Sequence, residues 1–314
     1  MIDVLVATDF GRNLLLQNDG NFKFSDVSTE HGLDIYGYGM GIAVGDSQRR
    51  GALDFVVTNV SEASFFKTEG AKLRPLQNTG QPLNRLGFGW GIAFLDADND
   101  GWPDLYVTNG HRFFPIFSSQ KNRFITTIDD QSVPMVDARY IEQPENIPVG
   151  LYYPKEYQKD RFYKNERGKF LDRTNRDLCA DMTDTLSVAV SDINRDGYDD
   201  FSVGIINPQS ERGVLLYKNR GGDNHYVQIK LRGHRSNSFG VGSVITVTAE
   251  DGSRQSQLVA IGESFLSQNS LVKAFGLGKS AKPPLVEVRW PSGIVQNIFN
   301  IPLDQLTVVE EPES

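Results

Sequence analysis

A segment that occurs three times along the chain constrains the fold more than any other feature. In each copy large and small residues alternate ahead of an acidic loop, and a second β-rich run follows the loop. A period of two is typical of a strand, because successive side chains of a strand point to opposite faces. Each copy is therefore predicted to be a β-hairpin whose turn is the acidic loop. The copies read MGIAVGDSQRRGALDFVVTN from Met40, WGIAFLDADNDGWPDLYVTN from Trp90 and LSVAVSDINRDGYDDFSVGI from Leu186.

A shorter piece repeats between these copies and predicts two further strands joined by a glycine-containing turn. With the hairpins it gives about four strands per repeat, and radial repetition of four-stranded sheets builds a β-propeller. The third repeat is interrupted by an insertion at about residues 111–159. The fold class predicted is all-β, with a partial propeller of four-stranded blades. The shorter piece occurs at residues 13–24, 64–73, 161–170 and 213–222.

The first repeat is incomplete. Alignment of its acidic loop places Asp3 at the ninth loop position, where the later copies have Asp54, Asp104 and Asp200. A half-blade leaves unpaired strand edges, which proteins normally cover. We therefore expect the missing strands to come from an upstream segment of a longer propeller or from a second chain, and we favour the upstream segment.

Two of the acidic loops follow the pattern D-x-D-x-D-G-x-x-D, or nearly so, and predict a calcium site. Side chains at positions 1, 3, 5 and 9 and the carbonyl at position 7 can converge as an oxygen-only shell, which suits Ca²⁺ better than Mg²⁺. An EF-hand is excluded because the flanking segments are strands and position 12 is valine. The alternative is a polar turn without metal. The predicted ligands are Asp96, Asp98, Asp100, the carbonyl of Trp102 and Asp104 in one loop, and Asp192, Asn194, Asp196, the carbonyl of Tyr198 and Asp200 in the other.

The loop of the Met40 copy is degenerate. It carries Asp46, Gln48, Arg50 and Asp54, so a guanidinium stands at position 5, where its charge would repel a metal ion. We expect this loop to hold no calcium, with Arg50 bridging Asp46 and Asp54 in its place.

From about Asn224 the pattern changes to alternating strands with predicted turns at Asp251-Gly252 and Ser292-Gly293, and the acidic loops cease. This indicates a compact, sandwich-like all-β unit. A cluster of Arg235, Asn237, Gly240 and Gly242 has the composition of a phosphate loop. It lacks the Lys-Ser/Thr ending and the following helix that such a loop requires, so nucleotide binding is not expected.

Charge narrows the range of partners. The formal net charge is -8 and the pI about 5.1, which argues against nucleic acid or an anionic membrane as the main partner. No window reaches the roughly 18 apolar residues of a membrane span, and the first residues lack the pattern of a secretory signal, which leaves a cytoplasmic location open. The single cysteine, Cys179, cannot form an internal disulfide.

Several segments together resemble the bacterial relatives of cartilage acidic protein, which join FG-GAP/VCBS propeller repeats to a C-terminal ASPIC/UnbV domain. The resemblance implies propeller repeats over residues 1–222 and an ASPIC/UnbV domain over 223–314. It also implies calcium binding, adhesion or interaction with a protein, carbohydrate or small molecule, and an extracellular or periplasmic location. The segments are residues 89–111, 190–204, 236–247, 262–268, 275–278 and 288–293.

Two other functions stay open. Some related propellers of bacterial natural-product pathways form carbon–carbon bonds, and insertions on a rigid scaffold are common sites of catalysis. No nucleophile and base with diagnostic spacing accompany the insertion. The third possibility is an inert structural fragment. Candidate residues for the enzyme are His111, Arg112, Asp137, Arg139, Tyr140, Tyr152 and Tyr153.

Overall fold

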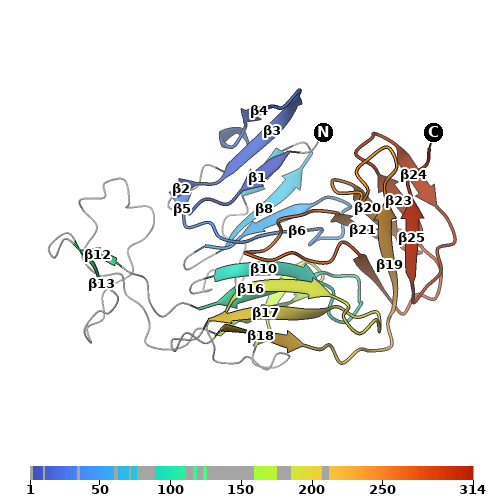
Figure 1. Cartoon of the computed structure of the whole chain (residues 1–314). Helices are drawn as coiled ribbons and strands as arrows, with labels where there is room; N and C mark the ends of the chain where they lie inside the picture. Colours follow the sequence, from blue (N-terminus) through green and yellow to red (C-terminus); the bar gives the residue numbers. More distant parts are fainter. Residues whose placement is uncertain are drawn as a thin grey trace.

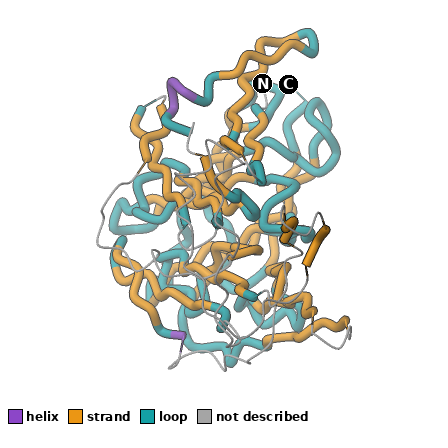
Figure 2. The backbone as a smooth tube through the Cα atoms, turned by 90° about the vertical axis from the view of Figure 1, so that its left-hand side faces the viewer, coloured by secondary structure: helices purple, strands orange, loops and turns teal. Residues whose placement is uncertain are grey.

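Strands and loops make up almost all of the described backbone (Figure 2), so the prediction of an all-β chain is confirmed. No helix among the described residues is long and apolar enough to cross a membrane. A computed structural model describes residues 3–9, 11–33, 36–59, 63–70, 72–75, 89–110, 116–118, 123–125, 159–174, 185–206 and 212–313.

Four antiparallel sheets follow one another along the chain and in space, like blades of a propeller (Figure 1). Each predicted hairpin is present, and the second and third blades have the four strands expected of a repeat. The first blade is β1 (Val4–Val6), β3 (Leu14–Gly20) and β4 (Lys23–Asp26); the second is β6 (Ile42–Gly45), β7 (Asp54–Val57), β8 (Ser64–Glu69) and β9 (Lys72–Pro75); the third is β10 (Gly89–Leu95), β11 (Asp104–Asn109), β14 (Arg161–Glu166) and β15 (Lys169–Asp172); the fourth is β16 (Thr185–Ser191), β17 (Asp200–Ile206) and β18 (Arg212–Tyr217).

Three shorter elements accompany the blades. The strands β2 (Gly11–Arg12) and β5 (Tyr36–Gly37) pair with each other, and a short 3₁₀ helix covers Thr29–His31. Within the insertion, β12 (Ile116–Ser118) pairs with β13 (Arg123–Ile125).

Small residues at the start of the first strand of a blade, or just before it, let the next blade approach closely. A Cβ atom added to Gly41 would collide with the carbonyl oxygen of Trp90, on the first strand of the third blade. Thr58 fills the same junction, because its hydroxyl accepts a hydrogen bond from the Gly41 N–H at 2.7 Å and donates to the Trp90 carbonyl. The junction between the third and fourth blades repeats this arrangement with Gly91, Thr108 and Leu186.

Apolar side chains fill the spaces between blades. The third blade is covered on both faces, because one buried cluster joins it to the second blade and another joins it to the fourth. In the latter the ring of Tyr106 lies 4.3 Å from that of Phe201. Burial of each large apolar side chain stabilises such a core by about 1.5–3 kcal/mol.

The strands after the fourth blade form a two-sheet sandwich with a core of its own, drawn from residues 227–309. We call it the C-terminal sandwich, and it lies beside the blades (Figure 1). The predicted turns at Gly252 and Gly293 are present, with φ of 80° and 92°. One sheet is β19 (His225–Arg232), β22 (Lys273–Gly278) and β25 (Leu306–Glu310), and the other is β20 (Val244–Thr248), β21 (Arg254–Leu258), β23 (Leu285–Arg289) and β24 (Val295–Ile298).

Candidate metal centre

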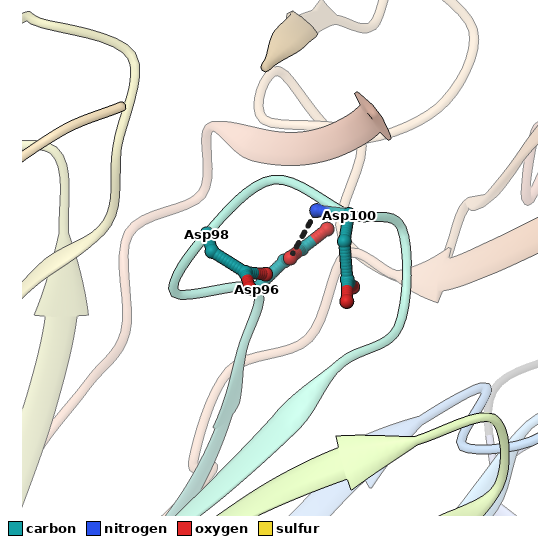
Figure 3. Close-up of side chains that lie close together, drawn as sticks. All are labelled: Asp96, Asp98 and Asp100. Carbon is teal, nitrogen blue, oxygen red and sulfur yellow. Dashed lines mark hydrogen bonds between the residues drawn. The ribbon is translucent and has the colours of Figure 1, made fainter. Parts of the chain in front are cut away.

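The loop between β10 and β11, residues 96–104, is called the Asp96 loop. Asp96 holds its shape, since its carboxylate accepts hydrogen bonds from the N–H groups of Asp100 at 3.0 Å and Gly101 at 2.8 Å. Gly101 has a φ of 85°, which favours glycine at position 6. Figure 3 shows the carboxylates of Asp96, Asp98 and Asp100 gathered in this turn. One oxygen from each lies within 4.8 Å of the others.

Asp104, at position 9, connects the Asp96 loop to the third strand of its blade. Its side chain is fully buried and accepts from the backbone N–H of Asn165 at 2.8 Å and of Ala97 at 3.3 Å. Trp102, predicted to supply a carbonyl, donates its own N–H to Asp100 at 2.8 Å. The loop therefore brings all four predicted carboxylates into one hairpin turn, two of them deeply buried.

A lysine that the sequence analysis missed lies among these carboxylates. The ammonium of Lys164, on β14, is 2.7 Å from Asp98, 3.2 Å from Asp100 and 3.2 Å from Asp104. Burial alone would lower the pKa of Lys164, but the carboxylates outweigh burial and hold that pKa above its ordinary value. The carboxylates of three predicted ligands therefore surround one position, which holds the Lys164 ammonium and favours a positive charge.

The acids of the Asp96 loop carry more negative charge than Lys164 offsets. Burial, reinforced by neighbouring carboxylates, raises the pKa of Asp96 well above its ordinary range. Burial also raises the pKa of Asp104 to about 7, although Lys164 and the Asn165 N–H oppose that shift. A divalent cation would favour the charged forms of both groups and reverse these shifts.

The loop between β16 and β17, residues 192–200, is called the Asp192 loop and has the same backbone bonds. Asp192 accepts from the N–H groups of Asp196 at 3.1 Å and Gly197 at 2.8 Å. Asn194 donates from its amide to Asp196 at 2.7 Å. Asn194 and Asp196 are exposed, so this loop offers fewer carboxylates in a wetter setting than the Asp96 loop.

The remaining predicted ligands of the Asp192 loop match their counterparts. Asp200 accepts from the N–H groups of Ile193 and Asn219, at 3.0 and 2.7 Å. Tyr198 donates its N–H to Asp196 at 3.1 Å, as Trp102 does to Asp100.

The degenerate loop, residues 46–54, is called the Asp46 loop, and the expectation for its arginine is half wrong. The guanidinium of Arg50 binds Asp54 at 2.7 Å and the carbonyl of Thr68 at 3.2 Å. It does not bridge to Asp46. The carboxylate of Asp46 is already engaged by the backbone N–H groups of Arg50 and Gly51, at 2.8 and 2.6 Å.

The alignment of Asp3 with the ninth loop position is confirmed. Asp3 accepts from the N–H of Asn18 at 2.9 Å, just as Asp104 accepts from Asn165 and Asp200 accepts from Asn219. Each of the three bonds joins the end of a loop to the strand that pairs with the strand following that loop, or to the residues just after that partner strand.

Asparagines in the shorter repeat lock successive loops together, a role that the sequence analysis also missed. The amide of Asn165 donates to the carbonyl of Pro103 in its own blade at 3.0 Å and to that of Ser47 in the preceding blade at 2.9 Å. Asn219 repeats both bonds one blade later, at 3.2 Å to the carbonyl of Asp199 in its own blade and at 2.8 Å to that of Ala97 in the preceding blade. The signal was the asparagine that follows lysine in residues 161–170 and 213–222.

The loop around Arg235 binds a carboxylate of its own chain. Glu311 accepts from three consecutive N–H groups, those of His234, Arg235 and Ser236, at 2.7–2.9 Å. Burial opposes ionisation, but these bonds and hydroxyl donors such as Ser292 lower the pKa of Glu311 to about 2. The N–H groups of this loop therefore bind a carboxylate within the C-terminal sandwich.

The candidates of the enzyme hypothesis lie outside the described residues, as does Cys179. They are His111, Arg112, Asp137, Arg139, Tyr140, Tyr152 and Tyr153.

Comparison with known proteins supports the C-terminal half of the resemblance. Residues 233–314 match the family described as ASPIC and UnbV. The chain is also similar to cartilage acidic protein 1 of Xenopus tropicalis, with 23% identity over 299 residues, which cover 87% of this chain and 45% of that protein. The chain therefore spans less than half the length of this relative. The ASPIC/UnbV part of the prediction is confirmed, and FG-GAP/VCBS repeats stay a prediction.

Proposed function

We propose that this chain is a calcium-stabilised interaction module, in which propeller-like blades carry Ca²⁺ in the Asp96 and Asp192 loops. The observation that carries the proposal is the gathering of Asp96, Asp98 and Asp100 at a hairpin turn, with ligand oxygens within 4.8 Å of one another. Such a group of like charges favours a multivalent cation.

Calcium fits these donors better than other common cations. All predicted ligands are oxygens, and the loops have no histidine or cysteine that would favour zinc. Ca²⁺ accepts six to eight oxygens in irregular geometry, whereas Mg²⁺ demands a near-ideal octahedron. Lys164 would withdraw from the carboxylates when the metal binds. The role is structural, because the loops join strands and interlock neighbouring blades.

The relatives support the interaction half of the proposal. The family match covers the C-terminal sandwich from residue 233 onward, and the similar frog protein is named for cartilage. We infer an extracellular partner, which would be a protein, a carbohydrate or another small molecule.

Calorimetry on the full chain tests the metal sites. Protein freed of metal by a chelator and titrated with CaCl₂ should take up two ions, and MgCl₂ should bind more weakly. Calcium at 100 times its dissociation constant should raise the free energy of unfolding by about 2.7 kcal/mol per site. Absence of binding heat and of stabilisation up to millimolar calcium would overturn the proposal.

A further inference from the structure

The acidic loops are also the surface on which the C-terminal sandwich rests. At the Asp192 loop, the amide of Gln228 on β19 donates to the Asp192 carboxylate at 2.7 Å, and Gln228 is only 8% exposed. Tyr226, two residues earlier, lies against Gly197, because a Cβ atom added to that glycine would overlap the tyrosine ring. One strand of the sandwich thus contacts a predicted metal ligand directly.

A second strand of the sandwich lies on the Asp96 loop. The N–H of Gly278, at the end of β22, donates to the carbonyl of Asn99 at 2.8 Å. Gly276 has no room for a side chain, because a Cβ atom there would collide with the Asp96 carboxylate and the Asn99 backbone. In addition, the amide of Asn224, just before β19, donates to the carbonyl of Asp98 at 2.7 Å.

The loops also contact one another beneath the sandwich. The amide of Asn99 donates to the carbonyl of Gly197 at 3.0 Å, which joins the Asp96 loop to the Asp192 loop. Arg49 of the Asp46 loop lies 5.3 Å from the ring centroid of Trp102 and also donates to the hydroxyl of Ser253 in the sandwich. The three loops form one continuous support.

A separate contact joins the sandwich to the blades without using the loops. The segment 264–270 hydrogen-bonds to first strands of the blades. Ser264 donates its N–H to the carbonyl of Ile42 at 2.6 Å, and Ser270 donates to that of Val190 at 2.9 Å. Docking of the sandwich therefore has a loop-dependent part, at β19 and β22, and a loop-independent part.

We propose that calcium binding and the loop-dependent docking of the C-terminal sandwich are thermodynamically coupled, a coupling that rests on the proposed function. A metal ion fixes the Asp192 carboxylate and the backbone of residues 98–99 in the positions that Gln228, Asn224 and Gly278 bind. Coupling is reciprocal. If calcium strengthens docking of the sandwich by a certain factor, the docked sandwich must strengthen calcium binding by the same factor.

Amide-resolved hydrogen exchange on the full chain tests the first direction. Calcium should slow exchange of the Gly278 N–H, which donates to the Asp96 loop, by about tenfold. The N–H of Ser270 is the internal control, because its partner Val190 lies outside the loops, and its exchange should change much less.

Calorimetry on variants tests the reverse direction. Gln228→Leu should weaken calcium binding about fivefold to tenfold at one site. Gln296→Leu is the matched control, since among the residues that the structure describes the side chain of Gln296 bonds only within the sandwich, to Trp290 and Glu310. The calcium affinity of this control should equal that of the wild type. Asn224→Ala, just before the first strand of the sandwich, tests the same coupling at the Asp96 loop. Its calcium affinity should also fall, and it replaces Gln228→Leu if that variant folds poorly.

Failure of the coupling and failure of the proposed function give different results. A wild-type chain that binds no calcium overturns both. The coupling alone is overturned if the wild-type chain binds two calcium ions but calcium leaves the exchange of the Gly278 N–H unchanged, and if Gln228→Leu and Asn224→Ala bind calcium as tightly as the wild type. In that case the metal sites stand.

Discussion

The Asp46 loop and the Asp96 loop have nearly the same backbone but neutralise their acids differently. In both, the first aspartate accepts hydrogen bonds from the N–H groups at positions 5 and 6, and the glycine at position 6 has a φ of 73° or 85°. In the Asp46 loop Arg50 supplies the positive charge from within the loop. In the Asp96 loop Lys164 supplies it from a neighbouring strand.

The comparison separates two roles within the acidic motif. Both loops have aspartate, glycine and aspartate at positions 1, 6 and 9. These residues shape the turn in both loops, although only the Asp96 loop has all the predicted metal ligands. Positions 3 and 5 differ, with Gln48 and Arg50 in one loop and Asp98 and Asp100 in the other. The carboxylates of Asp98 and Asp100 add negative charge, but they take no part in the backbone hydrogen bonds that the first aspartate accepts in both loops. They are therefore the part of the motif that indicates a bound cation.

The largest expected effect comes from position 1, where the loops should behave alike. Asp46→Ala and Asp96→Ala each leave two N–H groups without their acceptor and should lower the free energy of unfolding by about 2–4 kcal/mol. Urea unfolding with chelator present measures this. Asp19→Ala, an exposed control, should stay within about 0.5 kcal/mol of wild type. If Asp46→Ala is as mild as the control, position 1 does not shape the loop.

Next in size is a change that should affect the calcium-bound protein far more than the metal-free one. Asp98→Asn combined with Asp100→Asn keeps side chains of the same shape and removes two charges. With calcium at 100 times its dissociation constant, the double variant should lose about 2.7 kcal/mol of stabilisation at this site. In chelator its stability should change less, because the loss of two ion pairs to Lys164 is offset by the relief of repulsion on Asp96. Urea midpoints with and without calcium check this. An undiminished calcium shift would assign the binding to other residues.

The strands and the shape of the loops could be predicted because their causes lie close together in sequence. Alternating side chains and a glycine at position 6 each act over a few residues, so the hairpins and the placement of Asp3 follow from the repeat itself. The prediction that Arg50 bridges Asp46 and Asp54 is half wrong, and the cause again lies within the loop. Sequence shows that its charge is near both Asp46 and Asp54, but it does not show which acceptor the backbone has already occupied.

The residues that the sequence analysis missed act between distant segments. Lys164 and Asn165 meet the Asp96 loop about 60 positions away in sequence, across an insertion of unrelated composition. Gln228 reaches Asp192 only because the sandwich folds back onto the blades. Gly276 looks like any strand glycine until the loop backbone is seen beside it. Such contacts depend on the arrangement of whole sheets, which a local pattern does not encode.

A gain of function tests the comparison from the other side. Gln48→Asp with Arg50→Asp restores the acidic pattern in the Asp46 loop, and calorimetry should then count three calcium ions in place of two. In chelator the variant should be destabilised, because buried Asp54 loses its guanidinium partner. Calcium at thirty times its dissociation constant should restore about 2 kcal/mol. Two ions and no recovery would show that positions 3 and 5 are insufficient to make a site.

The smallest effect concerns Lys164, whose ammonium competes with the metal for the carboxylates of Asp98, Asp100 and Asp104. Lys164→Met keeps the length of the side chain and removes the charge, so calcium should bind the Asp96 loop about tenfold more tightly, equivalent to about 1.4 kcal/mol. Lys218→Met is the matched control, because Lys218 stands at the same place in the next repeat, is exposed and forms no ion pair among the described residues.

Calorimetry at low and high salt distinguishes the competing charge of Lys164 from general electrostatics. A surface effect would make both lysine variants bind calcium more tightly at low salt, and the gain would vanish as salt screens it. Direct competition predicts a gain for Lys164→Met alone that persists at high salt, since Lys164 is only 16% exposed among the acids. Equal affinity in wild type and Lys164→Met would mean that the ammonium leaves the carboxylates without cost when calcium binds.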